Sequence, residues 1–422
     1  MPRRGPSRPG GVGTSVAGIG THQPITVAPR LRNVPAFDGI RGLGVVTIIA
    51  IHAAPLVLES FSAVLDIFLA LSAFLVTTLL LEEGERSGTI SIRRFLERRA
   101  WRLLPALYVT LAAATALAAV LFAVAGNNAD LADFTFGDFV RREIIPAGLY
   151  VYNLVNPLGY PNQGVALYQM WSLSLEQQFY VAIAFLAGLM VARRWIVQVA
   201  LVLAAASIAV QVARITGHFG PLNFWLQRPD ALMLGVVAAI INSRLPEQLT
   251  DRQRRTITIG GWMGLIVMGV TMLWSIKALD RFGIYVPYLP AEPAEGVDPQ
   301  VAFEDAMAAL AAGNYWVKWG FTIVNWCMVV VLIAIVRQRE WIVSRFLALR
   351  PIRAVGRMSY SLYLIHTLPI LLFVGPLPRS NPPLRIVVAW ITAFVFAWPL
   401  YQFVEKRSVA RKERVTNRTA AT

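Results

Sequence analysis

The sequence predicts an all-α fold, a polytopic membrane helix bundle with about ten transmembrane helices. Of its 422 residues, 56% are hydrophobic and only 15% are charged, whereas a soluble protein is about half apolar and a quarter charged. The charged residues cluster between long apolar runs, and arginines concentrate in every second loop between those runs. These features are typical of a chain that crosses a membrane repeatedly.

Ten segments approach the roughly 20 mostly apolar residues that a spanning helix needs. The sixth is short, and a further segment, 144–157, is too short to span, so we interpret it as interfacial or re-entrant. The predicted spans are 40–58, 62–81, 102–125, 172–192, 195–215, 227–242, 257–276, 317–336, 358–376 and 384–404.

The loop charges predict the orientation of the chain. The loops after the second, fourth, sixth and eighth predicted spans are rich in arginine, as are both terminal segments, whereas the loop 277–316 is acidic and rich in proline. Because basic loops stay on the cytoplasmic side, both termini are expected to be cytoplasmic, in the inner (plasma) membrane of a cell. An even number of spans agrees with this orientation.

The chain divides into a membrane domain, 36–407, and two tails. Residues 1–35 are rich in Gly, Pro and Arg without apolar periodicity, which predicts a disordered cytoplasmic tail rather than a cleavable signal. Residues 408–422 form a basic cytoplasmic tail. The net charge of +15 comes mostly from loops and tails, so we do not expect nucleic-acid binding. The single cysteine, Cys327, allows neither an internal disulfide nor a zinc site, and no metal is expected.

Two ionisable residues share one face of the first predicted span. Arg41 and His52 are eleven residues apart, which at 100° per residue brings them within about 20° of each other and about 16 Å apart along the axis. Arg41 alone could be a snorkelling anchor, and His52 alone could be a packed histidine. Their shared face favours function. Asp38 could cap the helix or pair with Arg41.

A basic run, RRFLERRAWRLLP, leads into the third predicted span. Arg98, Arg99 and Arg102 lie within about one helical turn of this run. They could be ordinary cytoplasmic anchors, or they could form a cradle for phosphates, since arginine suits bidentate phosphate contacts.

Further ionisable groups lie in the predicted outer half of the membrane, where we also place His52. Glu176 lies in WSLSLEQQFY, Asp66 begins the second span, and Arg228 and Asp230 open the sixth. Pairing among them would lower the cost of burying their charges, so a structural ion-pair cluster is one interpretation. The other interpretation is that these ionisable groups take part in the function of the protein.

The stretch GRMSYSLYLIH enters the ninth predicted span. Ser359, Tyr363 and His366 fall near one face of that helix, and His366 would reach mid-membrane. His22 and His218 have no comparable setting, and we assign them no role.

These stretches together resemble the membrane acyltransferase-3 family, which includes O-acetylases of O-antigen, peptidoglycan and exopolysaccharide and macrolide acyltransferases. The resemblance covers about 36–407 and departs from the family at Val64, Leu69 and Ala73, where glycine, phenylalanine and glycine are usual. No hydrolase-like domain follows, so the membrane domain is expected to complete acceptor transfer. The matching motifs, in order, are DGIRGLGVVTIIAIH, VLDIFLALSAFLVT, RRAWRLLPAL, WSLSLEQQFY, RPDALMLG, GRMSYSLYLIH and YQFVEK.

The resemblance implies an acyl donor and a set of roles. The donor would be cytoplasmic acyl-CoA, commonly acetyl-CoA, as a co-substrate rather than a bound cofactor, and the acceptor a hydroxyl of a carbohydrate, glycolipid or small molecule. Arg41, Arg98, Arg99 and Arg102 would hold coenzyme A phosphates. His52 would be the general base or be transiently acylated. The supporting candidates are Glu176 or Asp66 to orient the imidazole, Tyr363 or Ser359 to donate to the oxyanion, His366 as a second base, and Trp171, Ser174, Arg228 and Asp230 to bind substrate.

Two other functions fit the same residues. A transporter or flippase for a polar or glycosylated substrate would also need intramembrane charges, although we find no inverted repeat by inspection. A structural subunit of an envelope-synthesis complex would tolerate changes at His52. Release of free coenzyme A separates the enzyme from the transporter.

Overall fold

A computed structural model describes residues 24–410, except for 32, 56, 126–134, 156–166, 218–227 and 292–296. His22, His218, and most of both predicted tails therefore lie outside the described residues. Within them the chain is helical, without a β strand. The elements are α1 (Pro35–Ala53), η1 (Glu59–Ala63), α2 (Val64–Ser87), α3 (Ile92–Ala125), α4 (Phe136–Phe139), η3 (Val140–Ile144), α5 (Ile145–Gly148), α6 (Tyr152–Val155), α7 (Met170–Arg193), α8 (Ile196–Ile215), α9 (Pro229–Arg244), α10 (Asp251–Leu273), η6 (Lys277–Phe282), α11 (Pro299–Ala312), α12 (Trp316–Arg337), α13 (Ile342–Leu347), α14 (Arg350–Arg357), α15 (Ser359–Ile365), α16 (Thr367–Pro369), η7 (Ile370–Val374), α17 (Pro382–Pro399) and η8 (Leu400–Glu405).

The described helices confirm the predicted helix bundle. Eight of them are long and apolar enough to cross a membrane, and a ninth span results if α14 and the segment Ser359–Val374, which meet at a bend of 52°, count as one. The predicted sixth span is occupied by α9, which has 16 residues, most of them buried. Helices thus occupy all ten predicted spans.

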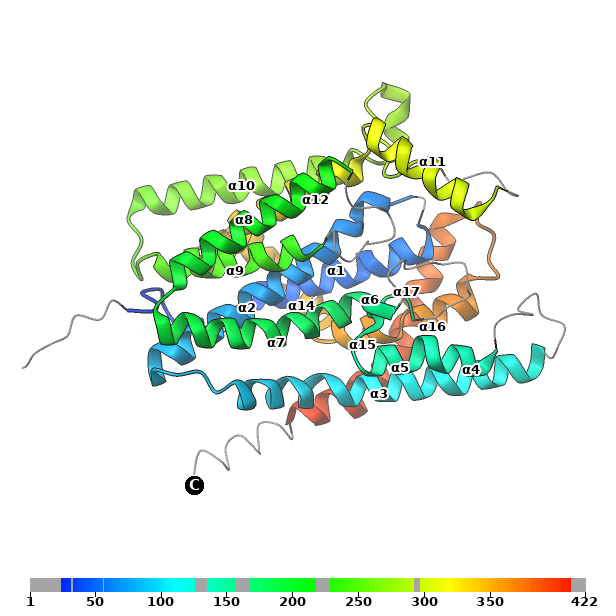
Figure 1. The fold of residues 1–422 in the computed structure, drawn as a ribbon, viewed down its shortest axis with the longest axis horizontal. Helices are drawn as coiled ribbons and strands as arrows, with labels where there is room; N and C mark the ends of the chain where they lie inside the picture. Colours follow the sequence, from blue (N-terminus) through cyan, green and yellow to red (C-terminus); the bar gives the residue numbers. More distant parts are fainter. Residues whose placement is uncertain are drawn as a thin grey trace, which may run out of the picture.

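The first two helices lie in the middle of the bundle. Figure 1 shows α1 and α2 (blue) between α10 along the upper edge and α3 along the lower edge, with α11 projecting at the upper right. The neighbours of α1 include α2, α13, α14 and α17, while α2 packs against α7, α9 and α12. This central position surrounds the face of α1 that carries Arg41 and His52 with protein rather than lipid.

Glycine allows α1 and α14 to touch through their backbones. A Cβ atom on Gly356 would lie 1.7 Å from the carbonyl oxygen of Asp38, and one on Gly42 would lie 2.4 Å from that of Ile352. Small residues permit such close helix packing. The contact brings the start of α15 next to Arg41.

Two boundaries differ from the sequence-based prediction. The third span, predicted from residue 102, begins at Ile92 because arginine, leucine and glutamate are good helix formers and continue the helix beyond the apolar run. At the N-terminus, residues 24–31 lie within the predicted tail, yet Ile25 is only 2% exposed. Its N–H donates to a carboxylate oxygen of Glu85 over 2.6 Å.

Within its described residues, 144–155, the segment 144–157 contains no helix long enough to span a membrane. It contributes the short helices α5 and α6, which contact α3 and α7. The Tyr108 hydroxyl donates to the carbonyl of Gly148 over 3.2 Å, and the Tyr152 N–H donates to Ser174 Oγ over 3.2 Å. Its depth in a bilayer stays a prediction.

Candidate functional site

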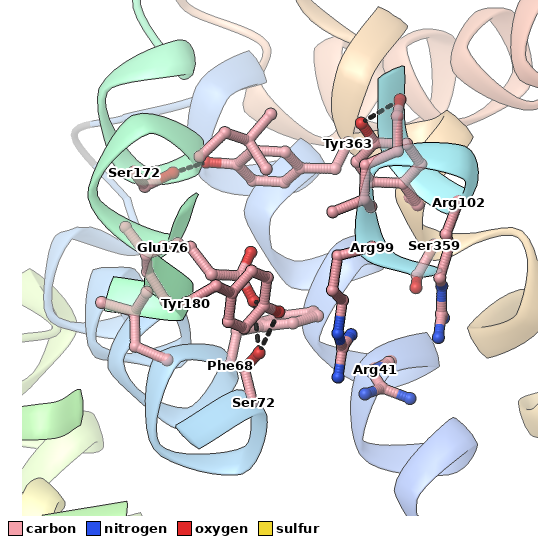
Figure 2. Close-up of a pocket in the computed structure, with 15 residues that line it drawn as sticks. Arg41, Phe68, Ser72, Arg99, Arg102, Ser172, Glu176, Tyr180, Ser359 and Tyr363 are labelled. Carbon is pink, nitrogen blue, oxygen red and sulfur yellow. Dashed lines mark hydrogen bonds between the residues drawn. The ribbon is translucent and has the colours of Figure 1, made fainter. Parts of the chain in front are cut away.

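A cavity opens among α1, α2, α3, α7 and α15. Its empty space is about 740 Å³, which includes space that is open to solvent. Figure 2 shows arginines on one side of the cavity and a cluster of hydroxyl and carboxylate groups on the other. The lining residues are Arg41, Leu65, Phe68, Leu69, Ser72, Arg99, Arg102, Leu103, Ser172, Leu173, Glu176, Tyr180, Ser359, Tyr360 and Tyr363.

Three arginines from two helices meet in this cavity. Arg41 comes from α1 and forms an ion pair with Asp38 of the same helix, with an N–O distance of 3.9 Å. Arg99 and Arg102 come from successive turns of α3, and the Arg99 guanidinium lies over the ring of Tyr180, 4.7 Å from its centroid. Positive charge is thus concentrated at one end of the cavity, where it suits an anionic ligand.

The predicted phosphate cradle differs from the structure at Arg98. This side chain does not line the cavity and instead forms an ion pair with Glu83 at the end of α2, with an N–O distance of 3.3 Å. An acidic partner near a basic run therefore draws one arginine away from the other two.

Glu176 lies in the cavity wall and is bound to hydroxyl groups. Ser72 Oγ donates to its carboxylate oxygen, and the Tyr180 hydroxyl donates to the same oxygen over 2.5 Å. Ser172, Glu176 and Tyr180 are spaced by four residues, which places all three on one face of α7. The same spacing is present in the sequence WSLSLEQQFY, although Glu176 was the only residue of this face among the predicted site residues.

His52 and His366 form a hydrogen-bonded pair. The distance between His52 Nδ1 and His366 Nε2 is 2.7 Å, and the distance from His366 Nδ1 to the carbonyl oxygen of Tyr363 is 2.8 Å. His366 is 0% exposed, whereas His52 is partly exposed and its ring also contacts the edge of Tyr168.

The hydrogen-bond pattern assigns the protons of the pair. A carbonyl oxygen only accepts, so His366 Nδ1 carries a proton, and Nε2 of the neutral ring accepts one from His52 Nδ1. The unprotonated nitrogen of His52 is then Nε2. This arrangement suits proton abstraction by His52, with His366 fixing its tautomer.

The residue that orients the imidazole of His52 therefore differs from the predicted candidates, Glu176 and Asp66. Among the described residues, the hydrogen-bond partner of His52 is His366. Glu176 contacts hydroxyls instead, and Asp66 forms an ion pair with Arg228 at an N–O distance of 2.7 Å. A single sequence could not show which of several polar helices would approach α1.

The predicted ion-pair cluster separates into two buried pairs. Besides the pair of Asp66 with Arg228, Asp230 receives hydrogen bonds from Arg214, Gln211 and Asn325, at 3.0 to 3.2 Å. The first pair joins α2 to Arg228, the residue directly before α9, and the second joins α8 to α9. Glu176 is not part of either pair, which corrects the expectation that it would join them.

The remaining predicted residues divide between the cavity and the packing around it. Ser359 and Tyr363 line the cavity, and the Tyr363 hydroxyl lies 2.5 Å from Ser172 Oγ. Trp171 and Ser174 do not line it, and Ser174 instead accepts the backbone N–H of Tyr152. Within the described residues, no cluster of three or more His, Cys, Asp or Glu residues could hold a metal ion.

Tyr363 connects the cavity to the histidine pair. Its side chain lines the cavity, and its carbonyl oxygen binds His366. The rings of Tyr363 and His366 are 5.6 Å apart between centroids. Through Tyr363, the arginine-lined cavity and the histidine pair are therefore connected by contacts between neighbouring residues.

Comparison with known proteins gives a family and several relatives. The chain is 25% identical over 391 residues to O-acetyltransferase OatA of Staphylococcus aureus, which covers 89% of this chain and 57% of that protein. It is 23% identical over 395 residues to peptidoglycan O-acetyltransferase OatA of Listeria monocytogenes, covering 88% and 55%. The chain thus spans somewhat over half the length of the curated relatives it matches. No solved structure matches it.

The family match extends through the whole candidate site. Residues 34–402 match the acyltransferase domain family Acyl_transf_3, a range that contains every cavity residue and both histidines of the pair. The chain therefore belongs to the membrane acyltransferase-3 family.

Proposed function

We propose that this chain is an integral-membrane O-acyltransferase. It moves an acyl group, acetyl in the simplest case, from cytoplasmic acyl-CoA to a hydroxyl of a carbohydrate or another envelope or secondary-metabolite acceptor. The observation that carries the proposal is the arrangement of one site, in which an arginine-lined cavity adjoins a histidine pair with an unprotonated Nε2.

The arginine end of the cavity is the proposed donor site. Arg41, Arg99 and Arg102 bind phosphates of coenzyme A, since guanidinium groups bind phosphate through paired hydrogen bonds. The pantetheine arm then extends past Ser172 and Tyr363 towards His52. This direction follows α1, along which Arg41 and His52 are about 16 Å apart.

The transfer step needs a base at the acceptor hydroxyl. His52 Nε2 takes the hydroxyl proton as the oxygen attacks the thioester carbonyl carbon. The carbon–sulfur bond breaks, the imidazolium returns the proton to the thiolate, and the products are an ester and free coenzyme A. The second imidazole, His366, holds His52 in the required tautomer.

The acceptor class is supported by the relatives rather than by the cavity. Both are named O-acetyltransferases, and the Listeria relative is named for peptidoglycan. We propose a hydroxyl on an envelope carbohydrate as the first acceptor to test. The same class of molecule would reach His52 from the side of the membrane opposite the arginines.

The proposed placement is in the inner membrane with both termini cytoplasmic. Support comes from the basic loops, which then lie on the cytoplasmic side together with the arginine end of the cavity. Reporter fusions test it. Fusions at both termini should be active with a cytoplasmic reporter and inactive with a periplasmic one.

The experiment that tests the function measures thiol release from acetyl-CoA by membranes that contain the chain, with envelope extract as the acceptor source. Acceptor-dependent release supports the enzyme. If no acyl-CoA in a panel yields free coenzyme A with any acceptor fraction, a transporter or flippase becomes the better account.

A further inference from the structure

Arg385, on the first turn of α17, binds three backbone carbonyls. Its Nε donates to the carbonyl oxygen of Ala53 over 2.9 Å. Its Nη1 donates to the carbonyl oxygens of Val374 over 2.9 Å and Leu377 over 2.7 Å. One guanidinium therefore bridges two segments that are more than three hundred residues apart in the sequence.

The segments that Arg385 joins are those that carry the histidine pair. Ala53 is the last residue of α1 and directly follows His52. Val374 is the last residue of η7, whose preceding turns begin at His366. Carbonyl groups at a helix end lack intrahelical partners and carry partial negative charge, so a cation there is stabilising.

We propose that Arg385 is a positioning residue, which holds the ends of α1 and η7 at the separation that lets His52 donate to His366. This inference rests on the proposed function for its importance to catalysis. The bond of 2.7 Å between the two rings joins residues 314 positions apart, so the relative position of their two segments determines it. Misplacement of a catalytic group by about 1 Å can lower a rate about a hundredfold.

The bridge requires arginine rather than positive charge alone. The planar guanidinium directs Nε and Nη1 towards separate acceptors at once, whereas the ammonium of lysine carries all of its donors on one nitrogen at the end of a flexible chain. A lysine would remain near one helix end and release the other. The effect of Arg385→Lys thus distinguishes a bridge from a simple charge at a helix terminus.

The kinetic test uses Arg385→Gln and Arg385→Lys in full-length protein, with Arg337→Gln as the matched control. Arg337, the last residue of α12, also donates to a backbone carbonyl of another segment, that of Pro246, but neither residue lies on a segment that carries the histidine pair. We expect kcat of thiol release per folded molecule to fall about tenfold or more in both Arg385 variants. The KM for acetyl-CoA should change by less than about twofold, since the donor cavity does not contain Arg385.

A second readout does not depend on activity. The chain has four histidines, so side-chain ¹⁵N resonances of histidine can be assigned by single substitutions. In the wild type, Nδ1 of both His52 and His366 should be protonated and Nε2 unprotonated. In Arg385→Gln and Arg385→Lys, His52 should show averaging between its two tautomers, while Arg337→Gln should keep the wild-type pattern.

The outcomes separate this inference from the proposed function. If Arg385→Lys keeps the wild-type kcat and histidine spectrum, a charge suffices and the bridge is wrong. If Arg337→Gln loses as much kcat as Arg385→Gln, the effect is general destabilisation and positioning is also wrong. If the wild type releases no thiol from any donor, the function fails, and the spectra of the Arg385 variants alone decide the role of this residue.

Discussion

Replacement of His366 with leucine tests the hydrogen bond that fixes the tautomer of His52. Leucine fills a similar volume but offers no acceptor to His52 Nδ1, which donates to His366 over 2.7 Å. His366 is 0% exposed, so bulk water does not reach the position of the lost acceptor. The variant therefore changes the proton position on His52 and leaves the donor cavity intact.

The magnitude follows from the burial of this bond. A buried donor that loses its partner costs about 1–3 kcal/mol. If the cost falls wholly on the transition state, kcat decreases about 5- to 150-fold, at about 1.4 kcal/mol per factor of ten. Removal of the base itself by His52→Ala should cost more, about 10²- to 10⁴-fold. His366→Gln should lose less than His366→Leu, since the glutamine amide oxygen can accept from His52.

The assay is acceptor-dependent release of free thiol from acetyl-CoA, normalised to folded protein in detergent. The expected order of kcat is wild type, His366→Gln, His366→Leu and His52→Ala, from fastest to slowest. If His366→Leu is as slow as His52→Ala or slower, the reasoning is refuted, and His366 becomes the better candidate for the base.

Three further changes test the cavity and the bundle. Arg99→Leu should lower kcat/KM for acetyl-CoA about 10- to 100-fold, as expected for the loss of charged hydrogen bonds. Arg98 lies outside the cavity, so Arg98→Leu should have little effect. Equal losses in the two variants would contradict the donor site. Asp66→Asn breaks the buried ion pair between α2 and Arg228 and should destabilise the protein by about 3–5 kcal/mol in thermal unfolding; an unchanged midpoint would show that the pair contributes nothing. Gly356→Ala puts a Cβ 1.7 Å from a backbone oxygen of α1 and should lower the stability of the protein by at least about 1–3 kcal/mol. Gly260→Ala has open space around its Cβ and should be neutral or stabilising. Equal melting curves for the two variants would refute the close contact.

Much of the fold could be predicted because the membrane imposes simple requirements on the sequence. Apolar runs of sufficient length predicted the helices, and helices occupy all ten predicted spans. The predicted start of α3 was wrong because an apolar run marks only the part of a helix in the membrane core. The helix itself begins earlier and includes Arg93 and its neighbours, which are good helix formers. Helix α11 in the predicted outer loop was missed, since the search sought apolar runs long enough to span a membrane and α11 has 14 residues.

The site was predictable only within single helices. The shared face of Arg41 and His52 follows from helical periodicity, as does the face that carries Ser172, Glu176 and Tyr180. The contact of His52 with His366 depends on how α1 approaches α15, which periodicity does not determine. Glu176 and Asp66 seemed equally suitable partners, yet hydroxyls and an arginine satisfy their carboxylates.

The most direct test of the account is thiol release from acetyl-CoA in membranes that contain the wild type, His52→Ala or His218→Ala, at matched levels of folded protein and with envelope carbohydrate as acceptor. The account predicts acceptor-dependent release by the wild type and by His218→Ala, and loss of about 10²-fold or more in His52→Ala. Release that persists unchanged in His52→Ala would contradict the assignment of His52 as the base.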